Sequence, residues 1–310
     1  MVGSFGVLVT VPTGDTYTVS LVGTDGKLVG SAQASTPTQV SCGDTAAAVL
    51  PSPISTSNTR VYYMDALGVV RFLTPKGDTG RATTVPIGSS RRSMFAVSPD
   101  DQRIAVVVSD FTASGAATRL YVEDLNGGTN HLDIFSETGA YGLWPTGWHG
   151  GSLVVAKVPT CTQGGGPFCC GPLEFHVVDP TTAARRFTVG GPTCRIAGAP
   201  SPAGVVCEND VQASVVDWTA VVLRAFPIQG LTEAHLSPDG RLVALVTGAN
   251  TTFDGATRSM SLQACGWIDS THVIAGGDAQ HQPRVGDATS GAIVPVAAQG
   301  VCGGRIPGAL

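Results

Sequence analysis

Two histidines of this chain stand close to a carboxylate in the sequence, a pairing that suits acid–base or metal chemistry. His235 follows Glu233 by two residues on a predicted strand, so both side chains are expected on the same side of that strand. His281 follows Asp278 in the loop GGDAQHQPR. A histidine beside a carboxylate can act as a general base or hold a divalent metal ion. The competing interpretation is that His235 is a buried residue hydrogen-bonded to the backbone.

Three arginines recur at one position relative to predicted turns. Arg92 and Arg195 each stand six residues before a serine that opens a turn, in RSMFAVS and RIAGAPS. Arg305, in RIPGAL, has the same spacing from a position just beyond Leu310. We therefore expect all three guanidinium groups at the same height around a common axis. Because guanidinium groups present rigid forks that match carboxylate or phosphate, this arrangement predicts a binding site for an anion.

Acidic residues offer each arginine a second, structural role. Four acids follow predicted second strands: Asp110, Glu208, Asp210 and Asp278. In this alternative each arginine pairs with an acid of its own repeat and stiffens the structure. Tyr141 and Trp144 are the aromatic residues expected to reach the same site. Since aromatic residues make up only 6% of the chain, we expect a small pocket rather than a long carbohydrate groove.

Several catalytic signatures are absent from the sequence. It has no GxSxG, HExxH, P-loop or dinucleotide-binding glycine pattern. Cys194 directly precedes Arg195, and a neighbouring guanidinium lowers the pKa of a thiol, so a cysteine nucleophile is conceivable. The alternative is that Cys194, Cys265 and Cys302, all near the starts of predicted inner strands, form disulfides. The even total of eight cysteines favours this alternative and an oxidising compartment.

A repeated hairpin must position these residues. The stretches AVSPDDQRIAVVVSD and HLSPDGRLVALVTG each run from an apolar strand through Ser-Pro-Asp into a second apolar strand. Proline presets the first corner of the turn, and Asp and Gly accept the conformations that follow. With weaker copies included, the repeat positions are residues 52, 98, 148, 201, 237 and 267. A tryptophan takes the place of the serine at positions 148 and 267.

The spacing of the repeat predicts seven units. A seventh repeat position is expected where the two chain ends meet, which gives units of about 40–45 residues, typical of a four-stranded propeller blade. We therefore predict an all-β, seven-bladed β-propeller of four-stranded antiparallel blades, with residues 1–310 as a single domain. GGRIPGAL at the carboxyl end is expected to supply the inner strand beside GVLVTVPTG at the amino end. The short unit between positions 237 and 267 predicts abbreviated outer strands.

These SPDG hairpins resemble the repeats of TolB-type β-propellers, a class also found in the non-catalytic propellers of prolyl peptidases. The resemblance covers most of the chain, strongly in two units and loosely in four. It implies the fold but no particular activity, because such propellers serve as scaffolds, lids, lyases and hydrolases. Ligands of propellers usually gather at the mouth formed by loops that enter the inner strands, so we expect the site there.

Composition excludes some partners and favours others. The formal charge is −5, and no basic cluster exceeds Arg91–Arg92, so nucleic acid is not expected as a partner. No apolar run approaches the roughly 20 residues of a transmembrane helix. The start, MVGSFGVLVTVP, lacks the features of an export signal, so we expect that a native signal has been removed. Together with the cysteines, this predicts an extracytoplasmic protein. A closed ring requires no dimer, so we expect a monomer.

Two functions follow from these patterns. The first is an exported propeller that binds a small anionic ligand or a protein partner at the mouth of its central channel. The alternative is a hydrolase or lyase acting on an anionic ester or uronate-like substrate, which the arginines would hold. His235 or His281, with Glu233 or Asp278, would then move a proton or bind one divalent metal ion in the channel. An enzyme should place a histidine and a carboxylate within about 3 Å, across an open pocket from the arginines.

Overall fold

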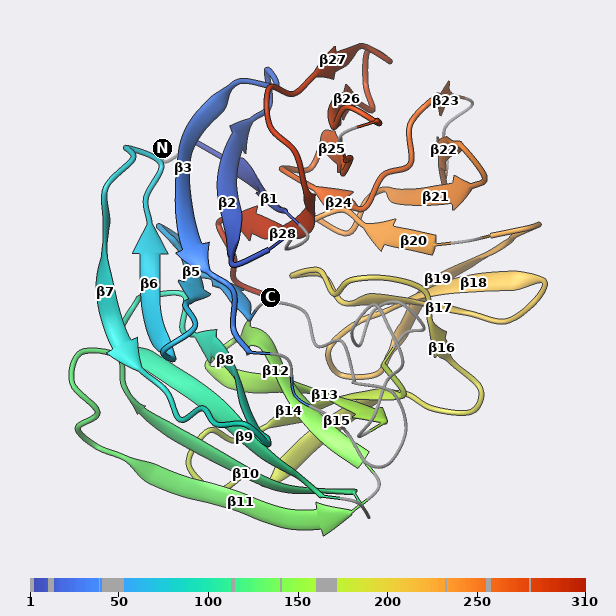
Figure 1. Ribbon diagram of the computed structural model, residues 1–310. Helices are drawn as coiled ribbons and strands as arrows, with labels where there is room; N and C mark the ends of the chain where they lie inside the picture. Colours follow the sequence, from blue (N-terminus) through green and yellow to red (C-terminus); the bar gives the residue numbers. More distant parts are fainter. Residues whose placement is uncertain are drawn as a thin grey trace.

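The chain forms a ring of four-stranded antiparallel sheets (Figure 1). The computed structural model describes residues 3–10, 14–38, 40, 53–112, 115–139, 141–159, 172–231, 233–254, 258–278 and 280–310. Within these residues 28 strands lie in seven sheets, and each sheet is one blade. The predicted all-β, seven-bladed propeller is therefore confirmed. No helix in the described part of the chain is long and apolar enough to cross a membrane.

The blades are numbered around the ring, with the innermost strand of each given first. Blade 1 consists of β28 (Val301–Ile306), β1 (Phe5–Val9), β2 (Thr16–Gly23) and β3 (Leu28–Ser35). Blade 2 consists of β4 (Ile54–Thr56), β5 (Val61–Met64), β6 (Val69–Leu73) and β7 (Thr79–Thr84). Blade 3 consists of β8 (Arg91–Val97), β9 (Arg103–Thr112), β10 (Gly115–Asp124) and β11 (Leu132–Gly139).

The remaining four blades follow the same order. Blade 4 consists of β12 (Tyr141–His149), β13 (Ser152–Pro159), β14 (Glu174–Val178) and β15 (Arg185–Gly190). Blade 5 consists of β16 (Arg195–Ile196), β17 (Val205–Glu208), β18 (Gln212–Val216) and β19 (Val222–Pro227). Blade 6 consists of β20 (Glu233–Leu236), β21 (Val243–Thr247), β22 (Asn250–Phe253) and β23 (Ser259–Met260). Blade 7 consists of β24 (Gly266–Trp267), β25 (His272–Ala275), β26 (Arg284–Asp287) and β27 (Ile293–Pro295).

The apolar sequences of the second strands follow from burial on both faces of each blade. On β9, the consecutive residues Val106 and Val107 are both fully buried. Successive side chains of a strand point to opposite faces, so Val106 packs in the cluster shared with blade 2 and Val107 in the cluster shared with blade 4. The described residues form seven such apolar clusters, one between each pair of neighbouring blades.

The serine of the repeated hairpin closes its turn with its side chain. Ser98 Oγ donates to Asp100 Oδ1 at 2.6 Å and accepts a hydrogen bond from the amide five residues later at 2.8 Å. Ser237 makes the equivalent contact to Asp239 at 2.8 Å. The next residue, Gly240, has a φ of 74°, which glycine adopts without strain. Asp100 and Asp239 therefore serve the turns, as their place in the motif indicates.

Three of the repeat positions differ from the sequence pattern. In blade 2 the turn serine is Ser57, whose Oγ accepts hydrogen bonds from two turn amides at 3.0 and 3.2 Å; position 52 lies outside the described residues. Trp148 corresponds in strand register to Val97, so it stands one residue before the serine position. Trp267 is displaced in the same way, as the last residue of β24. The outer strands of blade 6 are short, as expected.

These two tryptophans join neighbouring inner strands. Trp148 Nε1 donates to the carbonyl oxygen of Ala96 in blade 3 at 3.2 Å. Trp267 Nε1 donates to the carbonyl oxygen of His235 in blade 6 at 2.8 Å. Both acceptors lie two residues before a turn serine, so the bonds connect the carboxyl ends of adjacent inner strands. A large side chain at this position therefore links one blade to the preceding one.

We expect Trp267→Phe to destabilise the ring, because it removes the indole donor and three ring atoms from a buried site. The substitution leaves the buried carbonyl of His235 without the indole donor, which costs about 1–3 kcal/mol. Chemical denaturation followed by far-UV circular dichroism measures the loss. Trp148→Phe should cost a similar amount because it removes the equivalent bond. Unchanged denaturation midpoints for both variants would show that these bonds contribute nothing to the ring.

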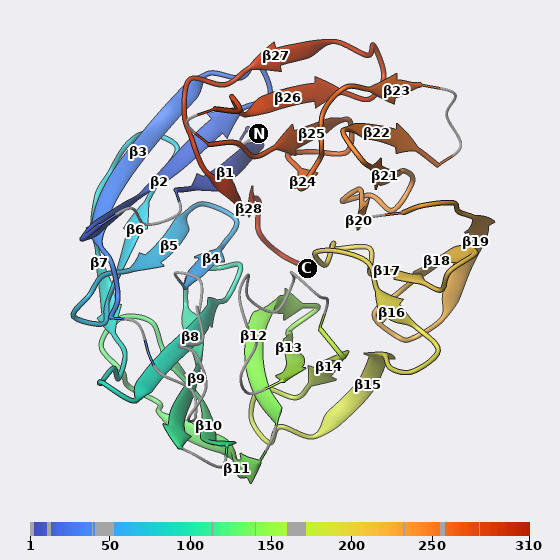
Figure 2. The same cartoon turned by 45° about the vertical axis from the view of Figure 1, so that its right-hand side comes forward.

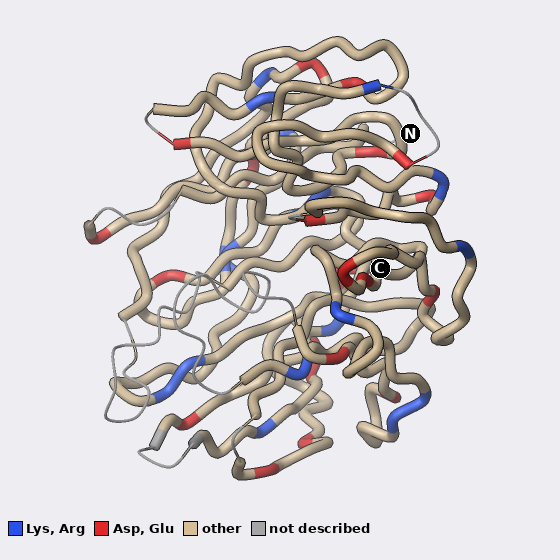
Figure 3. The backbone as a smooth tube through the Cα atoms, turned by 90° about the vertical axis from the view of Figure 1, so that its right-hand side faces the viewer, with Lys and Arg blue, Asp and Glu red and all other residues tan. Residues whose placement is uncertain are grey.

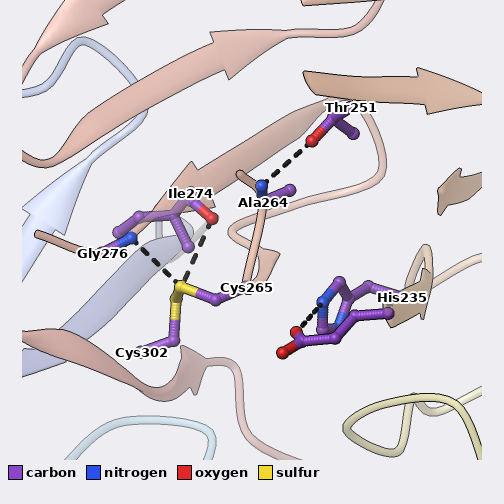
Figure 4. Close-up of a disulfide and its surroundings, with 8 residues drawn as sticks. His235, Thr251, Ala264, Cys265, Ile274, Gly276 and Cys302 are labelled. Atoms are coloured by element: carbon purple, nitrogen blue, oxygen red, sulfur yellow. Dashed lines mark hydrogen bonds and ion pairs between the residues drawn. A yellow bond between two sulfur atoms is a disulfide. The ribbon is translucent and has the colours of Figure 1, made fainter. Parts of the chain in front are cut away.

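The two ends of the chain close the ring within blade 1. β28 pairs antiparallel with β1, with Phe5 opposite Ile306, which confirms that terminal strands share one blade (Figure 2). A disulfide between Cys265 and Cys302 joins the segment entering β24 of blade 7 to β28, with a Cα–Cα distance of 5.8 Å (Figure 4). The bond therefore ties β28 to the neighbouring blade 7, while β28 and β1 are joined by strand pairing alone.

Loss of the Cys265–Cys302 disulfide should destabilise the protein more than loss of the second disulfide, Cys194–Cys207. The two bonds join residues 37 and 13 positions apart, and the chain-entropy relation gives about 4 and about 3 kcal/mol for loops of these sizes. Equilibrium unfolding of the paired Cys→Ala variants measures both values. A larger loss of stability from the Cys194–Cys207 pair would contradict the expectation that the longer closed loop gives the larger stabilisation.

Candidate functional site

The amino ends of the inner strands form one mouth of the ring and expose a mixed set of side chains. Five of the seven inner strands begin with an exposed residue in the described structure: Val301, Arg91, Tyr141, Arg195 and Glu233. This mouth therefore offers two cations, one anion, an aromatic ring and an apolar side chain. Elsewhere acidic and basic residues are interspersed along the chain (Figure 3).

Arg195 forms an ion pair within its own blade. It lies directly opposite Glu208 in the pairing of β16 with β17, and its Nη2 is 2.8 Å from Glu208 Oε1. The Glu208 side chain is only 9% exposed, against 63% for Arg195. Burial raises the pKa of Glu208 above its ordinary value even though the guanidinium opposes this. Asp210, two residues later, is exposed and lies beyond the strand.

In blade 3 the acid pairs with Arg91 rather than with Arg92. Arg91 lies opposite Asp110 in register, and two hydrogen bonds of 2.6 and 2.9 Å form a fork between them. The sequence pattern gave no reason to single out Arg91. Its position opposite Asp110 becomes clear only from the register in which β8 pairs with β9. The ion pair of Arg195 has the form of the alternative, structural role, whereas Arg91 is not one of the three arginines that the spacing singled out.

Arg92 is the exception among the arginines of the mouth. Its residue is 3% exposed, its Nε has no hydrogen-bond partner, and no acid of the described chain pairs with it. Burial lowers the pKa of Arg92. Its electrostatic neighbour is Tyr17, whose hydroxyl donates to the carbonyl oxygen of Met64 at 2.6 Å. A buried cation of this kind is costly unless a counter-charge joins it.

Arg305 does not lie at the height of the other two predicted arginines. Arg92 and Arg195 stand at the amino ends of β8 and β16, whereas Arg305 is the next-to-last residue of β28. The expectation of one common height was wrong because β28 ends at Ile306, four residues earlier than the spacing assumed. Burial lowers the pKa of Arg305 to about 10. Its Nη2 donates to the carbonyl oxygen of Ala309 at 3.3 Å, and no acid of the described chain forms an ion pair with it.

His235 and Glu233 point the same way along β20, as their spacing predicts. His235 Nε2 lies 3.1 Å from Glu233 Oε2, with the histidine side chain 5% exposed and the glutamate 49% exposed. The Nδ1 atom of His235 is buried without a partner. The imidazole of His235 is therefore buried, and it orients the carboxylate of Glu233, which is exposed at the mouth.

His281 and Asp278 also pair, with Nδ1 3.1 Å from Oδ1, and both side chains are largely exposed. Hydrogen bonds from the backbone amides of Gln280 and His281 lower the pKa of Asp278. An open pocket of about 390 Å³ lies beside this loop. Its lining comes from the β25–β26 loop and the segment leading into β28: Asp278, Gln280, Gln282, Pro283, Val296, Ala297, Ala298 and Gln299.

Histidine–carboxylate contacts recur outside the inner strands. His131 contacts Glu123 at 2.7 Å, and His176 contacts Glu174 at 2.8 Å. His272 contacts Asp269 at 3.0 Å. These pairs lie on turns and on second or third strands rather than on inner strands, so a histidine beside an acid is a common structural device in this protein. The His235 and His281 pairs therefore do not by themselves indicate catalysis.

The described residues do not form a zinc site in the centre of the ring. No group of three or more histidine, cysteine, aspartate or glutamate side chains converges within this part of the chain. Each candidate pair, such as His235 with Glu233, supplies two ligands at most, whereas zinc sites ordinarily take three or four protein ligands.

The two predicted aromatic residues lie in different environments. Tyr141 is 56% exposed at the mouth, and Lys157 Nζ lies 4.7 Å from its ring centre. Trp144 is buried in the apolar cluster between blades 4 and 5, so a ligand could reach it only after rearrangement of that core. Cys194 is bonded to Cys207, so the cysteine-nucleophile alternative does not hold in this structure. Cys42, Cys161, Cys169 and Cys170 lie outside the described residues.

Comparison with known proteins supports the fold and assigns no family. No known family's sequence model matches the chain, and no curated protein matches it. One similar chain is in the crystal structure of the mitotic checkpoint complex, with 14% identity, a TM-score of 0.51, and coverage of 87% of this chain and 83% of that chain. At this identity the likeness shows the propeller fold alone.

Two further structures are more weakly similar. The Dos1 propeller has 13% identity and a TM-score of 0.46, with coverage of 97% of this chain and 86% of that chain. Prolyl oligopeptidase B from Galerina marginata has 12% identity and a TM-score of 0.43. This chain spans 41% of the length of that peptidase.

We expect Arg195→Ala to destabilise the protein by about 1–2 kcal/mol near pH 7, because it leaves the buried Glu208 carboxylate without its partner. The folded pKa of Glu208 already lies above the ordinary 4.5, so protonation favours the folded state. The stability defect should therefore be fully present above the folded pKa of Glu208 in the variant, and it should shrink as the pH falls through that pKa toward 4.5. Thermal unfolding across pH 3.5–8 measures the profile.

Glu208→Gln in the Arg195→Ala background is the matched control. Removing the charge from the second partner should recover most of the lost stability and abolish the pH dependence of the defect. A defect in Arg195→Ala that is the same at every pH would show that Glu208 is not the group left unpaired.

Proposed function

We propose that this propeller binds a small anionic ligand at the mouth of its central channel. The observation that carries the proposal is Arg92, a cation on an inner strand that is buried without an acidic partner in the described chain. Burying an isolated charge costs several kcal/mol, which an incoming anion would offset. Because Arg92 is only 3% exposed, the anion contacts it after a local rearrangement of the mouth. Arg195 and Tyr141 are exposed at the same end of the ring and supply further polar contacts there.

A protein partner is the alternative candidate for binding at this mouth. The exposed Val301 and Tyr141, beside Arg195 and Glu233, combine apolar and charged groups in the manner of a recognition surface. Either a small anion or a carboxylate of a protein partner would form an ion pair with Arg92. The hydrolase or lyase alternative stays a prediction: His235, which would move the proton, is buried to nearly the same extent as Arg92.

Several broader inferences accompany this proposal. The SPDG hairpins support a TolB-type repeat, and the ring supports a single domain over residues 1–310 that acts as a monomer. The two disulfides in the described chain support an oxidising, extracytoplasmic setting, where such bonds persist. Size-exclusion chromatography with light scattering tests the monomer, and thiol titration of protein from its native source tests the setting.

Replacement of Arg92 by Met tests the anion proposal directly. Without ligand, Arg92→Met should raise the melting temperature, because it removes a buried unpaired charge at nearly constant volume. The probes are inorganic phosphate, sulfate and malonate, titrated at constant ionic strength. The wild type should show a saturable rise in melting temperature with at least one of them, and Arg92→Met should show none.

Arg241→Ala is the control for loss of charge, since the Arg241 side chain is 86% exposed on a turn. It should keep the anion response of the wild type. A fall in melting temperature for Arg92→Met without ligand, together with an unchanged anion response, would show that Arg92 is a structural cation and would remove the basis of the proposal. If no anion raises the melting temperature of the wild type or of either variant, and all three proteins remain stable, the protein-partner alternative is favoured over the small anion.

A further inference from the structure

The segment Pro307–Leu310 leaves β28 and crosses the centre of the ring. The Gly308 amide donates to the carbonyl oxygen of Ser57 in blade 2 at 2.8 Å, and the Leu310 amide donates to that of Trp148 in blade 4 at 2.9 Å. Blade 4 is three blades from blade 1 in one direction and four in the other. A segment that starts on blade 1 reaches it by passing through the middle, and Figure 2 shows this end of the chain there.

Blade 4 holds Leu310 by both its backbone and its side chain. His149 Nδ1 donates to the Leu310 carbonyl oxygen at 2.7 Å. The side chain packs against the apolar cluster between blades 4 and 5. Gly147 on β12 leaves room for it, since a Cβ at Gly147 would come within 2.7 Å of Leu310 Cδ1. The absence of a side chain at Gly147 therefore creates part of the space that Leu310 occupies, which we call the seat of Leu310.

The middle of the segment fits closely against blades 1 and 2. A Cβ at Gly308 would collide with the backbone of Thr56. The Ala309 carbonyl oxygen accepts the hydrogen bond from Arg305 at 3.3 Å, so the segment passes over that guanidinium. These contacts all lie at the carboxyl ends of the inner strands, opposite the mouth where Arg195 is exposed.

We propose that Pro307–Leu310 is a plug that shuts the centre of the ring at the carboxyl ends of the inner strands. The plug then closes this end of the axis to molecules, and Arg305 lies behind it. The plug contacts blade 1 through Arg305, blade 2 through Ser57, and blade 4 through Trp148 and His149. It opens fully only when the hydrogen bonds to Ser57, Trp148 and His149 are all broken. This inference does not depend on anion binding, and its test uses no anionic ligand.

The test displaces Leu310 with Gly147→Ala. The added methyl group strikes the Leu310 side chain, and Gly147 does not adopt a positive φ, so the strand itself tolerates alanine. Two quantities are measured in each variant: hydrogen exchange of the Leu310 and Gly308 amides by NMR, and the rate at which phenylglyoxal modifies Arg305, by mass spectrometry of its peptide. Both should increase by about tenfold or more, as expected when a local structure opens.

Gly266→Ala on β24 is the matched control, because the nearest atom to its Cβ is 4.0 Å away. It should leave both rates at the wild-type values. Gly147→Ala combined with Leu310→Ala removes the colliding atoms and should restore much of the protection. If Gly147→Ala does not fold, Leu310→Asp displaces the plug instead by placing a charge in the apolar seat.

Two results would overturn the proposal. Unchanged exchange of the Leu310 amide in both Gly147→Ala and Leu310→Asp would show that this seat does not hold the segment. Faster amide exchange with an unchanged rate of Arg305 modification would show that the segment moves but does not block access. Faster modification of Arg305 in the displaced variants, with wild-type rates in Gly266→Ala, supports the plug whatever the anion titrations show.

Discussion

Each blade of this propeller has two apolar faces, and this burial requirement governs the rest of the structure. A single four-stranded sheet cannot cover both faces, so each blade needs a neighbour on either side. The seven apolar clusters between blades show that the requirement is met all the way round. The ring must therefore close, and in this chain the two distant ends close it by sharing blade 1. The Cys265–Cys302 bond holds β28, the strand that completes blade 1, against blade 7.

Closure also determines what the inner strands can offer to a ligand. Their side chains point mostly into the interfaces between blades, so charged residues on them must pair, remain exposed or be buried at a cost. Arg91 and Arg195 pair with acids directly across their own sheets. Arg92 has no such acid in the described chain. The difference between Arg91 and Arg92 is one residue, which in a strand means opposite faces of the sheet.

The two ends of the axis are chemically different. The amino ends of the inner strands expose arginine, glutamate and tyrosine side chains. At the carboxyl ends the segment Pro307–Leu310 covers the middle through backbone hydrogen bonds and one apolar side chain. Arg92 and Arg305 lie at opposite ends, so they belong to two separate environments rather than to one ring of cations. The recurrence of histidine–carboxylate pairs outside the inner strands further separates structural pairing from catalytic geometry.

The sequence alone determined those features that depend on local order along the chain. The Ser-Pro-Asp turns, the seven units, the short outer strands of blade 6 and the common direction of His235 and Glu233 all follow from residue spacing within one or two strands. The shared terminal blade also followed, because the number of units left one strand missing at one end of the chain. These are consequences of strand periodicity and turn chemistry, which act over a few residues.

Only the tertiary structure decided where strands end and which residues face each other across them. Arg305 fell at a different height because β28 ends at Ile306, and Arg91 rather than Arg92 met Asp110 because the register of β8 with β9 places it there. The crossing of Leu310 to blade 4 joins residues more than 160 positions apart. Such contacts depend on how seven sheets pack around one axis, and a shift of one residue in register exchanges the faces of a strand.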